Sequence, residues 1–222
     1  VTFMKMMLVL GIKRRTSEDV ARPQKKIKRI VSSLPERLST ETQCPKTNLE
    51  DFFMSVVKSN EIHADVQSGD SIDDFFLDPT ENEIEAYKHD VLTAVRTKDL
   101  ATLRSFHEQG RPLKCSNKFG ESLLHLACRK GMADIAGFLV NEADVPLRIR
   151  DDYGRSPLHD ACWTASPNFS LIDLIIGNCP DLFYISDKRG HTPLSYVREE
   201  HWPMWKEYLQ KNVTLLRPRS IG

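Results

Sequence analysis

The stretch Gly154-Arg155-Ser156-Pro157-Leu158-His159-Asp160-Ala161-Cys162 decides how the chain folds, because it recurs. An upstream copy reads Gly120-Glu121-Ser122-Leu123-Leu124-His125-Leu126-Ala127-Cys128, and a downstream copy reads Gly190-His191-Thr192-Pro193-Leu194-Ser195-Tyr196-Val197. The leading glycines are 34 and 36 residues apart. A fainter copy comes first, where Ala94 and Gly110 each stand 33 residues before Ala127 and Ala143. Such a spacing indicates a repeat architecture built from one supersecondary unit.

The residue types within each copy predict a short helix, a turn and a second helix. Ser122, Ser156 and Thr192 can cap the first free N–H groups of a helix. Pro157 and Pro193 follow the last two caps, at a position where a missing N–H costs nothing. Leucine and alanine supply an inward face, Gly131 turns the chain, and a second apolar run begins at Ile135. The residues that predict a hairpin turn between copies stand three positions before each glycine and are Asn117, Asp151 and Asp187.

These copies resemble the ankyrin repeat, whose signature is Thr-Pro-Leu-His-x-Ala at a period of about 33 residues. The resemblance covers about residues 86–212 and implies an all-α solenoid of about four helix-turn-helix repeats joined by β-hairpin loops, preceded by a largely disordered N-terminal region. The chain also resembles ankyrin-repeat proteins of diatoms and related algae. The expected domains are a disordered region over 1–79, basic over 1–47 and acidic over 48–79, then repeats over 80–212 and a tail over 213–222.

The two ends of the repeat region carry residues that suit caps. Thr80 and Glu83 form a capping-box pattern at the start. Ile84, Tyr87, Val91 and Ala94 then keep helical spacing, which predicts one long first helix. At the other end, bulky aromatic residues are suited to covering the exposed face of the last repeat, and these are Trp202, Trp205 and Tyr208.

In this family the hairpin tips and the outer side of each first helix form one concave binding surface. The resemblance therefore implies protein-binding roles for Lys118, Phe119, Glu121, Arg129, Lys130, Asp152, Tyr153, Arg155, Trp163, Lys188, Arg189, His191 and Glu199. Aromatic residues among charges are typical of a protein-binding patch. The alternative for Phe119 and Tyr153 is that each packs on the adjacent hairpin. Two extra residues within 164–169 lie beside Trp163, where an insertion suits either partner selection or neutral drift.

Two His-x-x-Cys pairs, His125 with Cys128 and His159 with Cys162, raise the question of a zinc site or a Cys–His nucleophile. Stacked helices lie about 8–10 Å apart, whereas zinc bonds are roughly 2.0–2.3 Å long, so four ligands would converge poorly. A nucleophilic thiol needs an exposed, electropositive setting, and both cysteines fall on the inward side. We therefore expect no metal site, no cofactor and no catalytic residue, and the chain is not expected to be an enzyme.

The formal net charge of zero, from 31 basic and 31 acidic residues, hides an uneven distribution. Residues 1–47 hold 11 Lys and Arg against 4 Asp and Glu, and residues 48–87 hold 1 against 11. Residues 88–222 are nearly balanced, with 19 against 16. A basic segment followed by an acidic one is typical of tails that precede a domain. The balanced total disfavours a basic nucleic-acid binder.

The basic segment resembles a bipartite nuclear localisation signal, in which two clusters suit an import receptor with two acidic grooves. Its basic residues are Lys13, Arg14, Lys25, Lys26, Lys28 and Arg29. The alternative is an ordinary solvated tail. The signal makes a nuclear import receptor a candidate partner and predicts a nuclear or nucleo-cytoplasmic protein.

The acidic segment contains apolar residues at helical spacing. Leu49, Phe52, Phe53, Val56 and Val57 form one helix face behind Asn48 as a cap, in a helix too short to be stable alone. A second run, Asp73-Asp74-Phe75-Phe76-Leu77-Asp78, repeats the acidic and aromatic composition. These residues suit either a helix that folds into a partner's groove or a segment that docks back on the first repeat. For Phe75 and Phe76 the sequence favours docking.

The sequence thus predicts a non-enzymatic protein–protein interaction module, an adaptor or scaffold for another protein of unknown identity. The alternative is a nuclear transcription-linked regulator, in which the acidic aromatic segment is the effector. The most apolar run, residues 6–12, is far shorter than the roughly 20 residues that a membrane-spanning helix needs. The basic residues mainly follow that run, unlike those of a secretory signal. We expect an intracellular protein with no direct nucleic-acid or membrane partner.

Overall fold

The computed structural model describes residues 48–68 and 73–219 of the 222-residue chain. These residues are mostly helical, as the repeats predict. The helices are α1 Leu49–Ser59, α2 Glu81–Ala86, α3 His89–Arg96, α4 Leu100–Glu108, α5 Leu123–Arg129, α6 Ala133–Asn141, α7 Pro157–Cys162, α8 Phe169–Asn178 and α9 Trp202–Lys211. Shorter elements are the 3-10 turns η2 Asp73–Phe75, η3 Pro180–Tyr184, η4 Pro193–Tyr196, η5 Glu199–His201 and η6 Val213–Leu216, and the strands β1 Gln67–Ser68 and β2 Ile185–Ser186.

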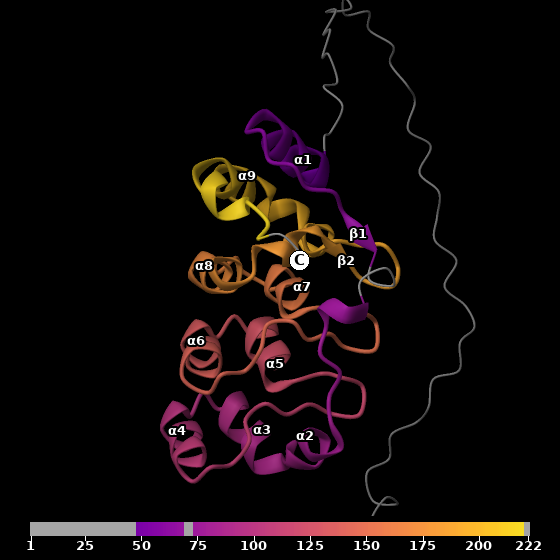
Figure 1. The fold of residues 1–222 in the computed structure, drawn as a ribbon. Helices are drawn as coiled ribbons and strands as arrows, with labels where there is room; N and C mark the ends of the chain where they lie inside the picture. The colour runs from indigo at the N-terminus through magenta and orange to yellow at the C-terminus, as the bar shows by residue number, and fades with distance from the viewer. Residues whose placement is uncertain (1–47, 69–72, 220–222) are drawn as a thin grey trace, which may run out of the picture. The chain divides into compact units, whose positions relative to one another are not determined.

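Four helix pairs stack to form the repeat region. The first repeat is α3 with α4, the second α5 with α6, the third α7 with α8, and the fourth η4 with α9. Figure 1 shows α3, α5 and α7 in one layer and α4, α6, α8 and α9 in another. Each repeat therefore contacts its neighbours through both layers, which is how short helices bury an apolar face that none could bury alone.

The core lies between the two layers and consists of the apolar residues that the repeats share. Leu124 and Leu158 of the first layer are completely buried, and so are Ile135 and Ile175 of the second. Ala127 is also completely buried, because a small residue lets α5 approach its neighbours closely. The leucine and alanine positions predicted to face inward in the second and third repeats are confirmed.

The fourth repeat closes the stack, but its first helix is only the 3-10 turn η4. The predicted cap by Thr192 is wrong, because its hydroxyl donates to the carboxylate of Glu50 instead of accepting from the turn. Trp205 lies on the buried face of α9, and the ring of Tyr208 in the same helix stacks on Phe169 with centroids 4.4 Å apart. Aromatic residues thus cover the last apolar surface, as expected.

The structure corrects the predicted long first helix. The chain leaves the helix after Ala86 and starts again at His89, so α2 and α3 are separate. The break frees the carbonyl of Glu83, which accepts the backbone N–H of Ser116 at 3.4 Å. In a continuous helix that carbonyl would accept the N–H of Tyr87. The capping box of Thr80 and Glu83 is present as predicted.

The prediction of disorder over 48–79 is wrong for the residues that the structure describes there. The predicted helix forms as α1, with the side chain of Asn48 accepting the N–H of Asp51 at 2.7 Å. Its apolar face is buried, and the ring of Phe53 lies 5.4 Å from that of Phe183. α1 packs beside α9, at the fourth repeat and not the first (Figure 1).

Two further boundaries differ from the expectation. The tail predicted from residue 213 begins with η6, where Leu216 is completely buried and its carbonyl accepts the hydroxyl of Tyr184 at 2.6 Å. Phe75 and Phe76 dock on the repeats as favoured, but they lie against Arg148 and Arg150 between the second and third repeats. The expected disorder of residues 1–47 and the basic residues of the localisation signal fall outside the described residues.

Candidate functional site

The hairpin tips that join the repeats share one geometry. In the first tip, Oδ1 of Asn117 accepts the backbone N–H groups of Phe119 at 2.9 Å and Glu121 at 3.1 Å. Asp151 and Asp187 hold the next two tips by the same pair of bonds, at distances between 2.8 and 3.0 Å. A short acceptor at this position therefore fixes each turn, as its spacing from the glycine predicts.

Neighbouring tips are bonded directly to each other. The N–H of Asp152 donates to the carbonyl of Phe119 at 2.8 Å, and the N–H of Lys188 donates to that of Tyr153 at 3.0 Å. Gly120 has a φ of +75°, and a Cβ there would lie 2.5 Å from the carbonyl oxygen of Arg150. The glycine thus serves both the left-handed turn and the close approach of the next hairpin.

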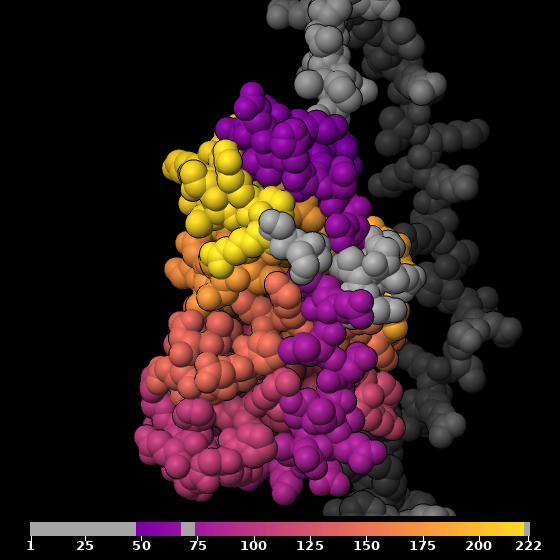
Figure 2. Space-filling view, in the orientation of Figure 1, coloured from indigo at the N-terminus to yellow at the C-terminus, as the bar shows by residue number. Residues whose placement is uncertain are grey.

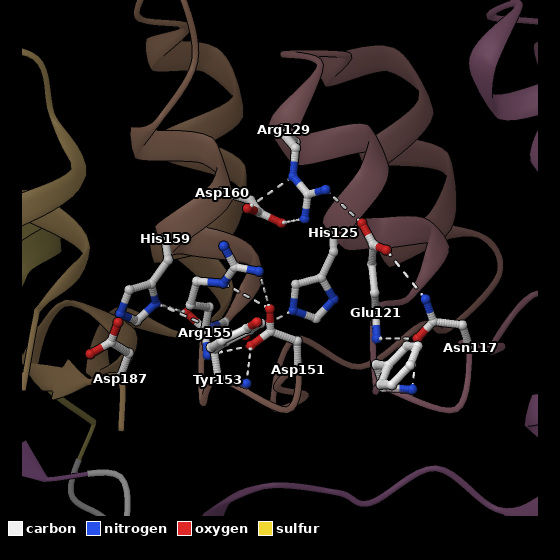
Figure 3. A network of polar contacts seen from close by, with 12 residues as sticks. Asn117, Glu121, His125, Arg129, Asp151, Tyr153, Arg155, His159, Asp160 and Asp187 are labelled. Atoms are coloured by element: carbon white, nitrogen blue, oxygen red, sulfur yellow. Dashed lines mark hydrogen bonds and ion pairs between the residues drawn. The ribbon is translucent and has the colours of Figure 1, made fainter. Parts of the chain in front are cut away.

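Two buried histidines brace the tips from the side of the helices (Figure 3). Nδ1 of His125 accepts the N–H of Ser122 at 3.3 Å, so the proton lies on Nε2, which donates to the carbonyl of Arg155 at 3.0 Å. His159 repeats this arrangement one repeat later, with Nε2 3.1 Å from the carbonyl of His191. Burial lowers the pKa of His159 to about 4 and lowers the pKa of His125 as well. Both imidazoles are therefore neutral at pH 7.

Ion pairs neutralise the carboxylates beside the tips. Figure 3 shows the guanidinium of Arg129 between Glu121 and Asp160, at 2.6 and 2.9 Å. Partial burial lowers the pKa of Arg129, but the hydrogen bond and charge of Asp160 raise it by more, so the group stays protonated. Arg155 pairs in the same way with Asp151 at 2.5 Å. These ion pairs hold the charged side chains in defined orientations beside the tips.

A cluster of rings lies where the third and fourth repeats meet. The ring of Tyr196 is 6.2 Å from Trp163 and 6.4 Å from His191, measured between centroids. Its hydroxyl donates to Asp187 at 2.6 Å and accepts from Arg189 at 2.9 Å. The cluster therefore joins the end of α7 to the last hairpin tip in one fixed arrangement.

The structure divides the sequence-predicted binding residues into two groups. Glu121, Arg129 and Arg155 are half-buried in ion pairs within the repeats. The others are exposed, and we call them the tip surface: Lys118, Phe119, Lys130, Asp152, Tyr153, Trp163, Lys188, Arg189, His191 and Glu199. Phe119 is 51% exposed and Tyr153 is 55% exposed, so neither ring is covered by the adjacent hairpin.

Sequence reasoning missed two residues that organise this region. Asp160 is buried and holds Arg129, and Tyr196 takes the equivalent place one repeat later. Both occupy the variable position of the Leu-His-x-Ala signature. A charged residue in an otherwise buried helix was the one available signal, because a buried carboxylate needs a partner. Within the insertion beside Trp163, Ala165 and Ser166 are exposed, and the side chain of Asn168 donates to the carbonyl of Gly131 at 3.0 Å.

The residues of the two His-x-x-Cys pairs are buried inside the repeats. Cys128 and Cys162 are buried among apolar residues, and burial raises the pKa of each thiol well above its usual value. Such thiols are poor nucleophiles and poor metal ligands. Within the described residues no group of three or more His, Cys, Asp or Glu side chains is placed to hold a metal ion. None of the helices described is long and apolar enough to span a membrane.

Three protein relatives share a short stretch with the chain. A Caenorhabditis elegans protein whose name places it among the glutaminases is 37% identical over 71 residues, 32% of this chain and 12% of the relative. SMC5-SMC6 complex localization factor protein 1 of Bos taurus is 30% identical over 95 residues, 43% of this chain and 8% of the relative. The eye-specific diacylglycerol kinase of Drosophila melanogaster is 40% identical over 53 residues, 24% and 4% respectively.

The matches cover about an eighth or less of the length of these relatives, so the likeness concerns one module and not their activities. The narrower resemblance to proteins of diatoms and related algae stays a prediction. A family model described as ankyrin repeats in three copies matches residues 91–178. This range begins in α3 and ends with α8, the first three helix pairs of the stack. The chain is therefore an ankyrin-repeat protein.

Proposed function

We propose that the chain is an adaptor or scaffold that binds a partner protein through the tip surface. Ankyrin repeats are in general protein–protein interaction modules without catalysis, and this proposal assigns that role to particular residues here. The observation that supports it is the exposure of Phe119, Tyr153 and Trp163 on a rigid frame. Covering such rings removes apolar area from water at little cost in conformational entropy, because their backbone is already fixed.

The distribution of exposed apolar side chains favours this surface over others. Six large apolar side chains are exposed in the described ranges, and three of them belong to the tip surface. Of the remaining three, Val66 and Leu77 lie in the extended segment that precedes α2, and Met204 lies in α9. A protein-binding patch combines aromatic anchors with a polar rim, and the charged tip residues supply such a rim.

Charge adds a second argument for a protein partner. Glu121, Asp151 and Asp160 are neutralised within the repeats, as described above. Within the described ranges no carboxylate pairs with Lys118 or Lys188. The tip surface therefore presents unpaired ammonium groups beside its rings, which suits a partner with carboxylates around apolar side chains.

The nuclear alternative depends on residues 13–29 and on the acidic aromatic segment. The structure gives this second candidate a condition: Phe53, Phe75 and Phe76 are buried against the repeats, so an effector role requires their release. A reporter fused to residues 1–47 tests import. An even distribution between nucleus and cytoplasm would contradict it.

Site-specific photo-crosslinking tests the proposed binding surface. A benzophenone amino acid replaces Tyr153 in one variant and Met204 in a control, because these side chains have similar exposures of 55% and 48%. Illumination in cells that express the protein is expected to yield a crosslinked partner from position 153 and none from position 204. Equal capture at both positions, or none at 153, would contradict the proposal.

A further inference from the structure

An extended segment from outside the repeats runs along them from the fourth repeat to the first. We call it the strap and define it as residues 62–68 and 73–79. Figure 1 shows it passing from α1, beside α9, along β2 to α2, and Figure 2 shows residues 73–79 on the surface of the third repeat. Its direction opposes the order of the repeats, which brings it past several hairpins in turn.

The strap and the α2 segment that follows it meet the same position in three successive repeats. Ser116, Arg150 and Ser186 each stand one residue before the acceptor that fixes a hairpin tip, and we call them the track. Ser68 pairs with Ser186 in a parallel bridge, and the ring of Phe76 lies 5.0 Å from the guanidinium of Arg150. The backbone N–H of Ser116 donates to the carbonyl of Glu83. The strap or α2 thus contacts the residue before the tip acceptor in each of the three hairpins.

The repeats contact the strap and α2 through backbone hydrogen bonds and through positively charged side chains. The N–H of Leu77 donates to the carbonyl of Arg148 at 2.8 Å, and the guanidinium of Arg148 lies 4.7 Å from the ring of Phe75. Lys114 pairs with Glu83 at 2.8 Å. An extended chain with carboxylates and adjacent aromatic rings therefore fits a row of backbone groups flanked by cations.

The fit of the strap is incomplete. Among the described residues three buried side-chain atoms lack a hydrogen-bond partner: Oε1 of Gln67, Oγ of Ser116 and Oδ1 of Asp181. Gln67 belongs to the strap and Ser116 to the track. Gln67 and Asp181 also line a cavity of about 540 Å³ between α1, the strap and η3. Unpaired buried polar groups weaken an interface, so a better-matched segment would hold the track more tightly.

We propose that Arg150 and Ser186 of the track, together with Arg148, form a binding site for an extended acidic segment with adjacent aromatic residues from a partner protein, and that the strap covers this site. The partner segment would take over the backbone pairing at Arg148 and the ring contacts of Arg148 and Arg150. Leu77 is 46% exposed and Asp74 and Asp78 are exposed, so one side of the strap is already in solvent. This site differs from the tip surface, and either one can exist without the other.

Competition with a labelled peptide tests the proposal. The probe is a fluorescein-labelled peptide with the sequence of residues 62–80, titrated with the full chain and followed by fluorescence anisotropy. Phe75→Ala with Phe76→Ala weakens the strap, and we expect this variant to bind the peptide at least tenfold more tightly than the unaltered chain. Adding Arg148→Ala should reverse the gain. Equal affinities for the three proteins would overturn the proposal.

A disulfide lock covers the case in which that variant fails to fold. Ser68→Cys with Ser186→Cys joins two paired backbone positions, in a Cys44→Ser background that removes a competing thiol. The reduced form should bind the peptide at least tenfold more tightly than the oxidised form. Each single cysteine variant should bind the peptide with the same affinity under reducing and oxidising conditions. Identical binding in both states would contradict the proposal.

Two controls distinguish this site from the tip surface and from self-association. Tyr153→Ala with Trp163→Ala alters the tip surface alone, so peptide binding is expected to stay unchanged and failure of the two proposals can be told apart. Size-exclusion chromatography with light scattering of the reduced protein reports strap exchange between copies. A monomer supports a separate partner, whereas a dimer that the disulfide lock abolishes would assign the track to a second copy of the chain and overturn the proposal.

Discussion

At the scale of single residues, neutral buried histidines join one repeat to the next. His159 accepts at Nδ1 and donates at Nε2 in the same way as His125, so each imidazole ties its own helix to the following hairpin. The fourth repeat has Ser195 at this position, and no fifth hairpin follows it among the described residues. Ser195 donates instead to Glu50 of α1 at 2.6 Å. The exception shows that the histidine serves the contact between repeats.

The buried imidazole makes stability depend on pH. Burial lowers the pKa of His159 to about 4, whereas an unfolded histidine has a pKa of about 6.5. The unfolded chain therefore takes up the proton first, and the free energy of unfolding should fall as the pH drops from about 6.5 to about 4. Complete titration corresponds to roughly 3 kcal/mol. Urea unfolding at several pH values measures the slope of the free energy of unfolding against pH.

The matched variants for this prediction are His159→Gln and His63→Gln. The first should remove about one proton from the slope in that pH window, and the second, at an exposed side chain, should leave the slope as it is. If His159→Gln kept the full slope, the neutral buried imidazole would not be its source.

Two hairpin glycines separate the cost of a left-handed backbone from the cost of a close contact. Gly120 and Gly190 have φ values of +75° and +84°, but a Cβ would meet the carbonyl of Arg150 only at Gly120. Gly190→Ala should cost about 1–2 kcal/mol from backbone strain. Gly120→Ala should cost about 1–3 kcal/mol more, since the next hairpin must move. Thermal unfolding compares the two, and equal losses would contradict the close contact.

At the scale of secondary-structure elements, α1 behaves as an additional cap on the fourth repeat. Its apolar face is buried, and Glu50 accepts hydroxyl groups from Thr192 and Ser195. A helix of 11 residues is not expected to be stable alone in water, so these contacts maintain it. The bonds from the hydroxyl groups of Thr192 and Ser195 to the carboxylate of Glu50 thus take the place of contacts with the hairpin of a fifth repeat.

Truncation of Phe53 tests the docking of α1. Phe53→Ala should lower the free energy of unfolding by about 3–5 kcal/mol, because the ring is buried against Phe183 and Tyr184. Phe52→Ala is the control, since that ring is only half-buried, and its loss should be smaller. Hydrogen exchange over residues 49–59 should rise in the first variant. A melting temperature unaffected by Phe53→Ala would show that α1 does not dock.

The local elements were predictable because their signals are local. Ser122, Pro157 and the leucine spacing predict the helices of the second and third repeats, and Asn48 with its apolar face predicts α1. What could not be predicted is long-range contact, which leaves no periodicity in the sequence. The break after Ala86 depends on a bond between Glu83 and Ser116, and the place of α1 depends on residues beyond position 180.

The candidate site was predictable to the same degree. The repeat spacing locates Phe119 and Tyr153 at the hairpin tips, but it left open whether their rings are exposed or pack on the adjacent hairpin. The roles of Asp160 and Tyr196 did not follow, because a variable position in the signature reveals its partner only when neighbouring repeats are stacked. Arg129 is predicted as a contact for a partner, and the structure shows it half-buried in an ion pair with Asp160, so its role in binding stays a prediction.

At the scale of the whole molecule, the acidic segment that precedes the repeats is part of the folded structure where it is described. The acidic segment is not a free tail where it is described, because α1 and the strap bury its aromatic residues against the repeats. The strap also links repeats that are not neighbours, from β2 near the fourth to α2 at the first. Contacts of this kind add cooperativity that a stack with nearest-neighbour contacts alone lacks.

The affinity for the captured partner measures the central proposal most directly. Isothermal titration calorimetry compares the unaltered chain with Tyr153→Ala plus Trp163→Ala, and with Met204→Ala as a control at another exposed apolar residue. We predict that the double variant raises the Kd at least tenfold, equivalent to about 1.4 kcal/mol, while the Kd of the control stays unchanged. A Kd unaltered by the double variant would contradict binding through the tip surface.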